Sequence, residues 1–211
     1  MIEYEKIETV FERSTEGDKK LIEGRYRNPT VQMCRNLAWD WTEKIDGTNI
    51  RIHWDGHKVT FGGRTERANI PAHLLNRLID LFGGETNAQL FEQKFGDKEV
   101  MLFGEGYGTK IQSVGSQYNL DGVDFILFDV QVSGMYLLRD GVEDIARCFG
   151  IAAVPVVLRG DIDDAIAYVR SKPMSTIGSA PMEGLVGRLP EELFDRRGNR
   201  LIVKIKVRDF T

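Results

Sequence analysis

The feature that most constrains the fold is the alternation of apolar and polar residues over positions 39–61, which has the two-residue period of a half-buried β-strand. Ile50, Ile52 and Trp54 fall on one face of this pattern, and the Asp55-Gly56 pair favours a hairpin turn. The segment therefore predicts antiparallel strands with one apolar and one polar face.

The rest of the chain combines helical and strand-like patterns. Apolar positions recur at helical spacing in residues 72–82, 86–95, 142–149 and 161–170. Apolar, β-branched stretches predict strands at residues 99–103, 123–132, 154–158, 184–188 and 201–207. We expect the first of these strands to end in a loop at the glycine-rich segment Gly104–Gly108, and Asp124 and Asp129 to find partners or solvent. The total predicts an α+β chain with mainly antiparallel sheet.

Composition limits the possible classes of protein. A chain of 211 residues with 42% apolar content, no repeat and no linker-like tract favours one domain spanning residues 1–211. The net charge of −4 gives no global attraction to nucleic acid, so any nucleic-acid contact must be local. Cys34 and Cys148 lack metal-ligand spacing and predict free thiols. Without a signal-like or membrane-spanning run, we expect a soluble, cytoplasmic protein that has no membrane partner.

Lys44 is the candidate nucleophile, because it stands at the predicted end of one strand and a turn before the next. A lysine that attacks a phosphoanhydride must be neutral, although its ordinary pKa is ~10.4. Lys204 and Lys206 alternate on one strand and therefore share a face. They are suited to holding phosphates and to favouring an uncharged Lys44, but an exposed edge-strand face is the alternative.

Several other residues have placements that suit nucleotide chemistry. Glu105 and Glu183 are candidates for ribose or magnesium binding, with a simple turn and an exposed strand start as their alternatives. Phe128 is a candidate platform for a purine or a core residue, and Arg64 is a candidate phosphate ligand or a surface charge.

Five motifs taken in chain order carry a resemblance to a known family. They are Lys44-Ile-Asp-Gly-Thr-Asn49, Phe103-Gly-Glu-Gly-Tyr-Gly108, Asp124-Phe-Ile-Leu-Phe-Asp-Val130, Glu183-Gly-Leu-Val-Gly-Arg188 and Val203-Lys-Ile-Lys206. Over residues 39–207 this series resembles the covalent nucleotidyltransferase superfamily, and Thr48-Asn49 is most similar to nick-sealing RNA ligases of the RNA ligase 2 type.

The resemblance implies a nucleotidyltransferase (adenylation) domain of antiparallel sheets, flanked by helices around an ATP cleft in an ATP-grasp-like arrangement. It implies ATP and Mg²⁺ or Mn²⁺ as cofactors, and an AMP carried on Lys44. By the same resemblance, Glu183 supports the metal and Lys204 and Lys206 act in catalysis with Lys44. The implied nucleotide-binding residues are Glu43, Lys44, Ile45, Asn49, Arg64, Glu105, Phe128, Glu183, Lys204 and Lys206.

The implied partners are RNA ends, a 5′-phosphate and a 3′-hydroxyl, including those of a nicked duplex. Larger ligases follow the last lysine motif with a further domain, whereas only residues 207–211 follow it here. Neither an OB-fold nor a helical module is expected, so the chain is either a minimal stand-alone ligase or the catalytic part of one. RNA contacts must then come from the domain itself or its N-terminal region. Candidates are Arg25, Arg27 and Arg35 near Tyr26, with a solvated basic patch as their alternative, and the loop over residues 110–118.

Three alternatives stay open at this point. The first is ligation of DNA, the second is a capping guanylyltransferase, and the third is a catalytically idle module that binds nucleic-acid ends. Sequence alone leaves the oligomeric state open, as well as the choice among a nick, a single-stranded end and a broken tRNA.

Overall fold

The computed structural model describes residues 1–17, 19–118 and 121–210, which form two compact units. Unit 1 comprises Met1–Glu5 and Asp46–Val154, and unit 2 comprises Lys6–Ile45 and Pro155–Thr211. In the part of the chain that is described, no helix has the length and apolar composition needed to cross a membrane.

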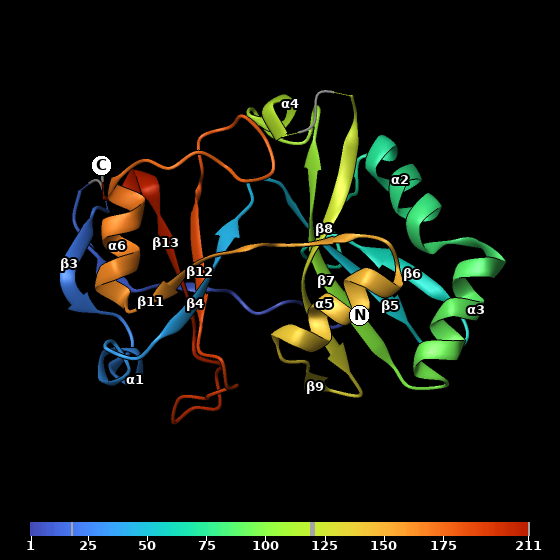
Figure 1. The fold of residues 1–211 in the computed structure, drawn as a ribbon, viewed down its shortest axis with the longest axis horizontal. Helices are drawn as coiled ribbons and strands as arrows, with labels where there is room; N and C mark the ends of the chain where they lie inside the picture. Colours follow the sequence, from blue (N-terminus) through green and yellow to red (C-terminus); the bar gives the residue numbers. More distant parts are fainter. Residues whose placement is uncertain (18, 119–120, 211) are drawn as a thin grey trace. The chain divides into compact units, whose positions relative to one another are not determined.

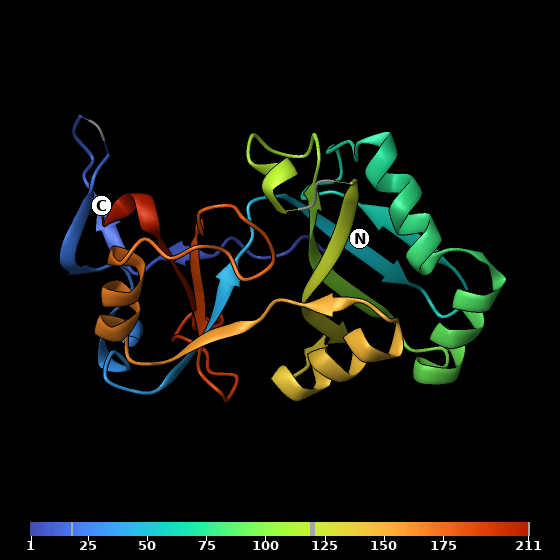
Figure 2. The ribbon, with the colours of Figure 1, turned by 45° about the horizontal axis from the view of Figure 1, so that its top comes forward.

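Unit 1 is built on a six-stranded sheet with the order β10-β8-β7-β5-β6, in which β9 also pairs with β8 (Figure 1). Its strands are β5 (Thr48–Trp54), β6 (Val59–Gly62), β7 (Val100–Gly108), β8 (Val123–Val132), β9 (Met135–Tyr136) and β10 (Ala152–Ala153). Its helices are α2 (Ala72–Phe82), α3 (Gly84–Phe95), α4 (Gly115–Tyr118) and α5 (Arg139–Cys148). Figure 2 shows α2 and α3 following one another beside the strands.

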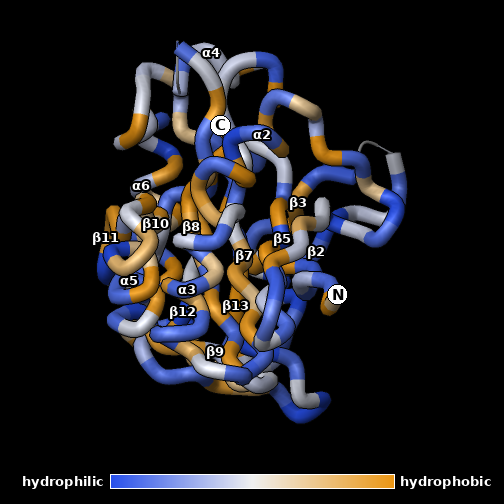
Figure 3. The backbone as a smooth tube through the Cα atoms, turned by 90° about the vertical axis from the view of Figure 1, so that its right-hand side faces the viewer, coloured by the Kyte–Doolittle hydropathy of each residue, from blue (hydrophilic) through white to orange (hydrophobic). Residues whose placement is uncertain are grey.

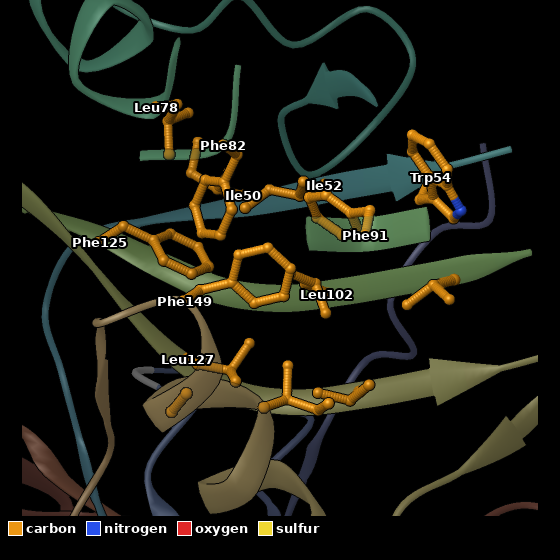
Figure 4. Packing of buried hydrophobic residues seen from close by; sticks show 14 of the residues in the cluster. Ile50, Ile52, Trp54, Leu78, Phe82, Phe91, Leu102, Phe125, Leu127 and Phe149 are labelled. Atoms are coloured by element: carbon orange, nitrogen blue, oxygen red, sulfur yellow. The ribbon is translucent and has the colours of Figure 1, made fainter. Parts of the chain in front are cut away.

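The core of unit 1 lies between one face of this sheet and the helices α2, α3 and α5. Strand residues such as Ile50, Leu102 and Leu127 meet Phe82 and Phe149 from the helical side (Figure 4). The tube in Figure 3 carries hydrophobic stretches along β7 and β8, as this burial requires. Because side chains alternate across a strand, the opposite face of the sheet is left for polar groups.

Unit 2 holds a five-stranded sheet with the order β1-β13-β12-β4-β11 and a separate two-stranded sheet, β2-β3. Its strands are β1 (Glu8–Thr9), β2 (Phe11–Arg13), β3 (Leu21–Tyr26), β4 (Trp39–Lys44), β11 (Val156–Gly160), β12 (Gly184–Arg188) and β13 (Ile202–Lys206). Its helical segments are α1 (Pro29–Met33), α6 (Ile162–Arg170) and the 3-10 turn η1 (Val207–Asp209). The apolar face of α6 packs on a core that includes Trp39, Trp41 and Leu185.

Most of the predicted elements are confirmed. The mixed α+β composition and the dominance of antiparallel pairing hold, with only the pairs β1–β13 and β8–β10 parallel among the described residues. The predicted turn at Asp55-Gly56 joins β5 to β6. Both cysteines are free. Asp124 pairs with Arg77 at 3.1 Å, and Asp129 accepts a hydrogen bond from Tyr4 at 2.8 Å.

One expectation was wrong: the glycine-rich segment Gly104–Gly108 is not a loop but the second half of β7. Its glycines serve close packing instead of turning. A Cβ atom at Gly104 would collide with the ring of Phe125, and one at Gly106 would meet Leu74. Glu105 is therefore a strand residue, fixed by its cross-strand neighbours Asn49 and Ile126.

Candidate functional site

In unit 2, three adjacent antiparallel strands bring Lys44, Glu183 and Lys206 together. Gly184, the first residue of β12, is the cross-strand partner of Lys44 on β4 and of Lys206 on β13. A Cβ atom at Gly184 would collide with the carbonyl of Ile205, so the close approach of β12 and β13 requires glycine there. Glu183 directly precedes this glycine and lies between the two lysine strands.

The carboxylate of Glu183 accepts hydrogen bonds from both lysines. The Nζ atom of Lys206 donates to Oε1 at 2.7 Å, and the Nζ atom of Lys44 donates to Oε2. Burial raises the pKa of Glu183, but the charge of Lys44 and the hydrogen bonds from both lysines outweigh it and hold that pKa below its ordinary value. Glu183 is therefore a stable anion between two cations.

Lys204 joins this cluster from the same face of β13 as Lys206, as its alternation predicted. Partial burial, together with the charges of Lys206 and Lys44, lowers the pKa of Lys204 to about 8. Burial is the largest of these causes, and the charges of the two neighbouring lysines add to it. Three amines lie near two carboxylates, Glu183 and Glu8, and the excess of positive charge suits an anionic ligand such as a polyphosphate.

Glu43, next to Lys44, is held by a residue that sequence reasoning missed. Its carboxylate accepts hydrogen bonds from the backbone N–H of Thr176 at 2.9 Å and from the Thr176 hydroxyl at 2.6 Å. Glu43 is only 2% exposed, and its second oxygen, Oε1, is buried with no hydrogen-bond partner among the described residues. No pattern in the segment around Thr176 signals this contact. Ile45 is buried as well.

In unit 1, Asn49 and Glu105 are direct cross-strand partners on the sheet face opposite the helices. The Oδ1 atom of Asn49 is buried, and no described residue donates a hydrogen bond to it. A Cβ atom at Gly47 would collide with the carbonyl of Gly106 and the side chain of Glu105. The turn after Lys44 therefore lies directly against the strand that carries Glu105.

Phe128 owes its placement to an irregularity in the sheet. Phe103 pairs with Asp129 and Gly104 pairs with Leu127, so Phe128 has no cross-strand partner among the described residues of β7 and stands at a β-bulge. Bulges of this kind redirect side chains and are common beside functional sites. The ring of Tyr4 contacts the ring of Phe128 edge-on, with 5.0 Å between centroids, and Phe128 is only partly buried.

Arg64 lies exposed on the loop after β6, and its side chain has no partner among the described residues. The base of this loop is tied down by Arg51, which is 1% exposed. The Nε atom of Arg51 donates to the carbonyl of Gly63 at 2.6 Å, and Nη1 donates to the carbonyls of Met1 at 3.0 Å and Ile2 at 2.9 Å. The predicted phosphate ligand thus stands free on a fixed loop.

The predicted RNA contacts fall into different environments. Arg25 pairs with Glu12 at 2.6 Å and Arg27 pairs with Glu8 at 2.8 Å, so acids already compensate both guanidinium groups. The ring of Tyr26 packs edge-on against Phe11, whereas Arg35 is exposed.

The segment over residues 110–118, expected to be a loop throughout, ends in the short helix α4 (Gly115–Tyr118) and contacts the turn that follows Lys44. The Nε2 atom of Gln112 donates to the carbonyl of Gly47 at 3.0 Å, and the hydroxyl of Tyr118 accepts from the N–H of Asp46 at 3.4 Å. This segment therefore supports the turn next to the candidate nucleophile.

Within the described ranges, no group of three or more histidine, cysteine or acidic side chains is placed to hold a metal ion by itself. A metal at Glu183 would need further ligands, such as phosphate oxygens of a bound nucleotide. This donor set fits Mg²⁺ or Mn²⁺, which bind through one or two carboxylates plus substrate phosphates.

Comparison with solved structures shows the same fold in RNA ligases. A mutant of Naegleria gruberi RNA ligase with AMP and Mn matches with a TM-score of 0.66 and 18% identity, covering 95% of this chain and 59% of that chain. Another mutant of the same enzyme, with ATP and Mn, matches with a TM-score of 0.64 at 18% identity and the same coverage. This chain thus spans about 59% of the length of those ligases.

Comparison of the sequence with known proteins gives two results. A search of curated proteins finds no match. A model of the RNA ligase family matches residues 38–206, which include the whole series of motifs from Lys44 to Lys206. On this match, which covers far more than half of its length, the chain belongs to the RNA ligase family.

Proposed function

We propose that this chain is an ATP-dependent RNA ligase whose first step joins AMP to Lys44. The observation that carries the proposal is the convergence of Lys44 and Lys206 on the carboxylate of Glu183, with Lys204 on the same strand face. A nucleophilic amine, a group of cations and one carboxylate are what nucleotidyl transfer to a lysine requires. We also propose that residues 1–211 form a single adenylation domain with an ATP cleft.

In the first step, the neutral Nζ of Lys44 attacks the α-phosphorus of ATP. A P–N bond forms, the P–O bond to the β-phosphate breaks, and pyrophosphate leaves with the bonding electrons. The amine enters as its free base with two N–H protons; one of them is lost to solvent, and the phosphoramidate keeps the other. Lys204 and Lys206 stabilise the negative charge that develops on the phosphate oxygens.

Glu183 has two parts in this proposal. It positions the amines of Lys44 and Lys206 before ATP enters, and it is the carboxylate that would hold a divalent metal together with the phosphates. A bound Mg²⁺ or Mn²⁺ would neutralise phosphate charge and orient the leaving pyrophosphate.

The remaining residues bind the nucleotide. Glu43 and Asn49 each keep a buried oxygen to which no described residue donates, which supports a ligand that brings hydrogen-bond donors, such as the adenine amino group or a ribose hydroxyl. Glu105 is assigned to the ribose, and Phe128 to the face of the adenine. Arg64 is assigned to a phosphate, and Ile45 to the apolar wall beside Lys44.

In the later steps, the AMP passes to the 5′-phosphate of an RNA end. The 3′-hydroxyl of the other end then displaces AMP, forming the phosphodiester bond. Dividing the joining in this way replaces one difficult reaction by easier covalent steps.

The test is incubation of purified protein with α-³²P-ATP and Mg²⁺, followed by denaturing electrophoresis. We expect label on the wild-type protein and on the control Lys98→Ala, an exposed lysine of unit 1, and none on Lys44→Ala. Addition of 5′-phosphorylated nicked RNA should then release the label and yield a sealed strand.

Absence of label, with bound AMP excluded by mass spectrometry, would overturn the proposal. Label from GTP in place of ATP would indicate a guanylyltransferase. Sealing of DNA but not RNA would indicate a DNA ligase.

A further inference from the structure

The connection between β12 and β13, residues 189–201, folds into a short hairpin. Phe194 forms a bridge with Arg200, and the N–H of Leu201 donates to the carbonyl of Leu193 at 2.8 Å. The carboxylate of Asp195 organises the tip, because it accepts from the backbone N–H groups of Arg197 at 2.8 Å and Asn199 at 2.9 Å. Figure 1 shows this segment projecting beyond the ends of the two strands.

The hairpin is fixed at its base as well as at its tip. Arg200 is 4% exposed and binds both carboxylate oxygens of Glu192, at 2.5 Å and 3.0 Å. The side chain of Asn28 donates to Asp195 at 3.2 Å and ties the tip to the start of α1. A bidentate pair and a set of side-chain hydrogen bonds restrict the motion of this segment, so the groups that it exposes are already ordered.

The exposed side chains of this hairpin include an aromatic ring and two guanidinium groups, besides Glu191, Leu193 and Asn199. Phe194 is 56% exposed, and Arg196 and Arg197 are both exposed. Neither guanidinium has an ion-pair partner within the part of the chain that the structure describes. By contrast, Arg25 on β3 and Arg27 directly after it are each paired with an acid, at 2.6 Å and 2.8 Å. The hairpin holds three acids, Glu191, Glu192 and Asp195, against three arginines, so its formal charge is zero. Within the described chain Arg200 is ion-paired, whereas Arg196 and Arg197 are not.

Two free guanidinium groups beside an exposed aromatic ring match the chemistry of a polynucleotide strand. Guanidinium groups bind phosphate oxygens through a planar pair of N–H donors, and aromatic rings stack on unpaired bases without regard to sequence. An apolar protein partner would explain Phe194 but would leave both arginines without acids.

We propose that the β12–β13 hairpin binds the RNA substrate through phosphate contacts of Arg196 and Arg197, with Phe194 against a base or sugar. This proposal rests on the proposed ligase function and adds a second place where the RNA contacts the protein, away from Lys44. Lys44 pairs with Gly184 at one end of β12, and the hairpin follows Arg188 at the other end. Five residues at ~3.4 Å each separate the two by about 17 Å or more. The hairpin therefore contacts RNA several nucleotides away from the ends that are joined.

The experiment measures binding of fluorescent nicked RNA duplexes by anisotropy over a series of salt concentrations. The test variant is Arg196→Gln/Arg197→Gln, and Phe194→Ala is made separately. The control is Lys98→Gln/Arg147→Gln, which removes the same charge from exposed sites of unit 1. Two duplexes are compared, one with about 15 base pairs on each side of the nick and one with about 4. At ~3.4 Å per step, the short arms extend only about 14 Å from the nick and do not reach the hairpin.

For the long duplex, we expect the test variant to bind about 8- to 60-fold more weakly at 0.1 M salt. For each phosphate contact, the binding constant varies with salt concentration to the power of about −0.9. At 0.1 M salt, loss of one contact therefore weakens binding about 8-fold, and loss of two weakens it about 60-fold. The slope of log K against log salt should become shallower by about two, one for each arginine. The short duplex and the control should show neither change, and self-adenylation with ATP alone should stay at the wild-type level.

Two results would overturn the hairpin proposal by itself. One is wild-type binding by the test variant, and the other is an equal loss in the control, which would indicate a general charge effect. A wild-type protein that self-adenylates but binds no RNA would overturn the RNA substrate along with the hairpin. Absence of self-adenylation would instead mark failure of the proposed function.

Discussion

Lys44 and Lys206 stand on opposite sides of one glycine, because both are cross-strand partners of Gly184 in a continuous antiparallel sheet. Their amines reach the same carboxylate, that of Glu183. Backbone pairing, not side-chain flexibility, therefore sets the spacing of the two amines. This is a rigid arrangement of the sort that positioning of a nucleophile requires.

Replacement of the bridging carboxylate should separate positioning from folding. In Glu183→Gln, the two amines lose their shared anion while side-chain volume is kept. We expect the rate of self-adenylation to fall about 10- to 100-fold, a usual range for loss of a group that orients a metal site. Single-turnover labelling measures the rate, and a thermal melt close to that of the wild type is the folding control. An unchanged rate would contradict the role given to Glu183.

The hydroxyl of Thr176 should contribute to stability through Glu43. Thr176→Val keeps the shape and the backbone donor but removes a hydrogen bond to a buried carboxylate. One oxygen of that carboxylate already has no partner among the described residues. We expect a loss of about 1–2 kcal/mol in the free energy of unfolding, measured by urea denaturation. Thr176→Ser keeps the donor and should lose much less. Equal losses in the two variants would argue against the hydrogen bond.

Lys204 predicts a pH dependence of stability. Its pKa is about 8 in the folded protein and 10.5 in the reference state, so the folded state binds fewer protons between these values. The contribution of Lys204 to the free energy of unfolding should therefore rise as the pH rises from about 8 to 10.5. Below pH 8, Lys204 is charged in the folded protein, and its burial destabilises the fold to the full extent. Lys204→Met removes that cost. The variant should gain stability over wild type at pH 7, and the gain should shrink as the pH approaches 10.5.

Urea denaturation of both proteins at several pH values measures this difference. A gain that stays constant across the window would show that Lys204 titrates normally in the folded state. Lys98→Met, at an exposed site, serves as the control and should give the same pH profile as the wild type.

Arg51 should be the main tie between the first residues of the chain and the loop that carries Arg64. Arg51→Met leaves the carbonyls of Gly63, Met1 and Ile2 without their donor, in a site where the arginine is 1% exposed. We expect a loss of roughly 3 kcal/mol, since each buried unsatisfied group costs about 1–3 kcal/mol. Arg67→Met, at an exposed position on the same loop, should change stability by less than about 0.5 kcal/mol.

Chemical denaturation measures both variants. A loss in Arg51→Met no larger than that in Arg67→Met would mean that solvent replaces the arginine at these carbonyls.

Periodicity predicted the elements well where each one buries a single face. The strand over residues 184–188 and the strand over residues 123–132 agree with β12 and β8, and the helix over residues 86–95 lies within α3. Periodicity failed at Gly104–Gly108, because glycine marks both turns and close packing. Only the ring of Phe125 and the side chain of Leu74 decide between them there.

The candidate site was predictable to the extent that its residues carry motifs. Lys44, Glu183, Lys204 and Lys206 were chosen from their order and alternation, and the structure brings them into one cluster in unit 2. Thr176 and Arg51 were not predictable, because each makes its contacts through a loop whose path no local pattern specifies. Nor did the bulge at Phe128 have a signal in the strand pattern.

The sequence by itself determined which residues can carry the chemistry and which side of each strand or helix is apolar, since both follow from residue type and local period. Only the tertiary structure decided that Lys44 and Lys206 share one carboxylate, that Glu43 is held by Thr176, and that Arg196 and Arg197 have no acid partner in the described part of the chain. These contacts depend on strand register and on loop closure between residues far apart in the chain. Register and loop closure come from the packing of the whole core, not from any one segment.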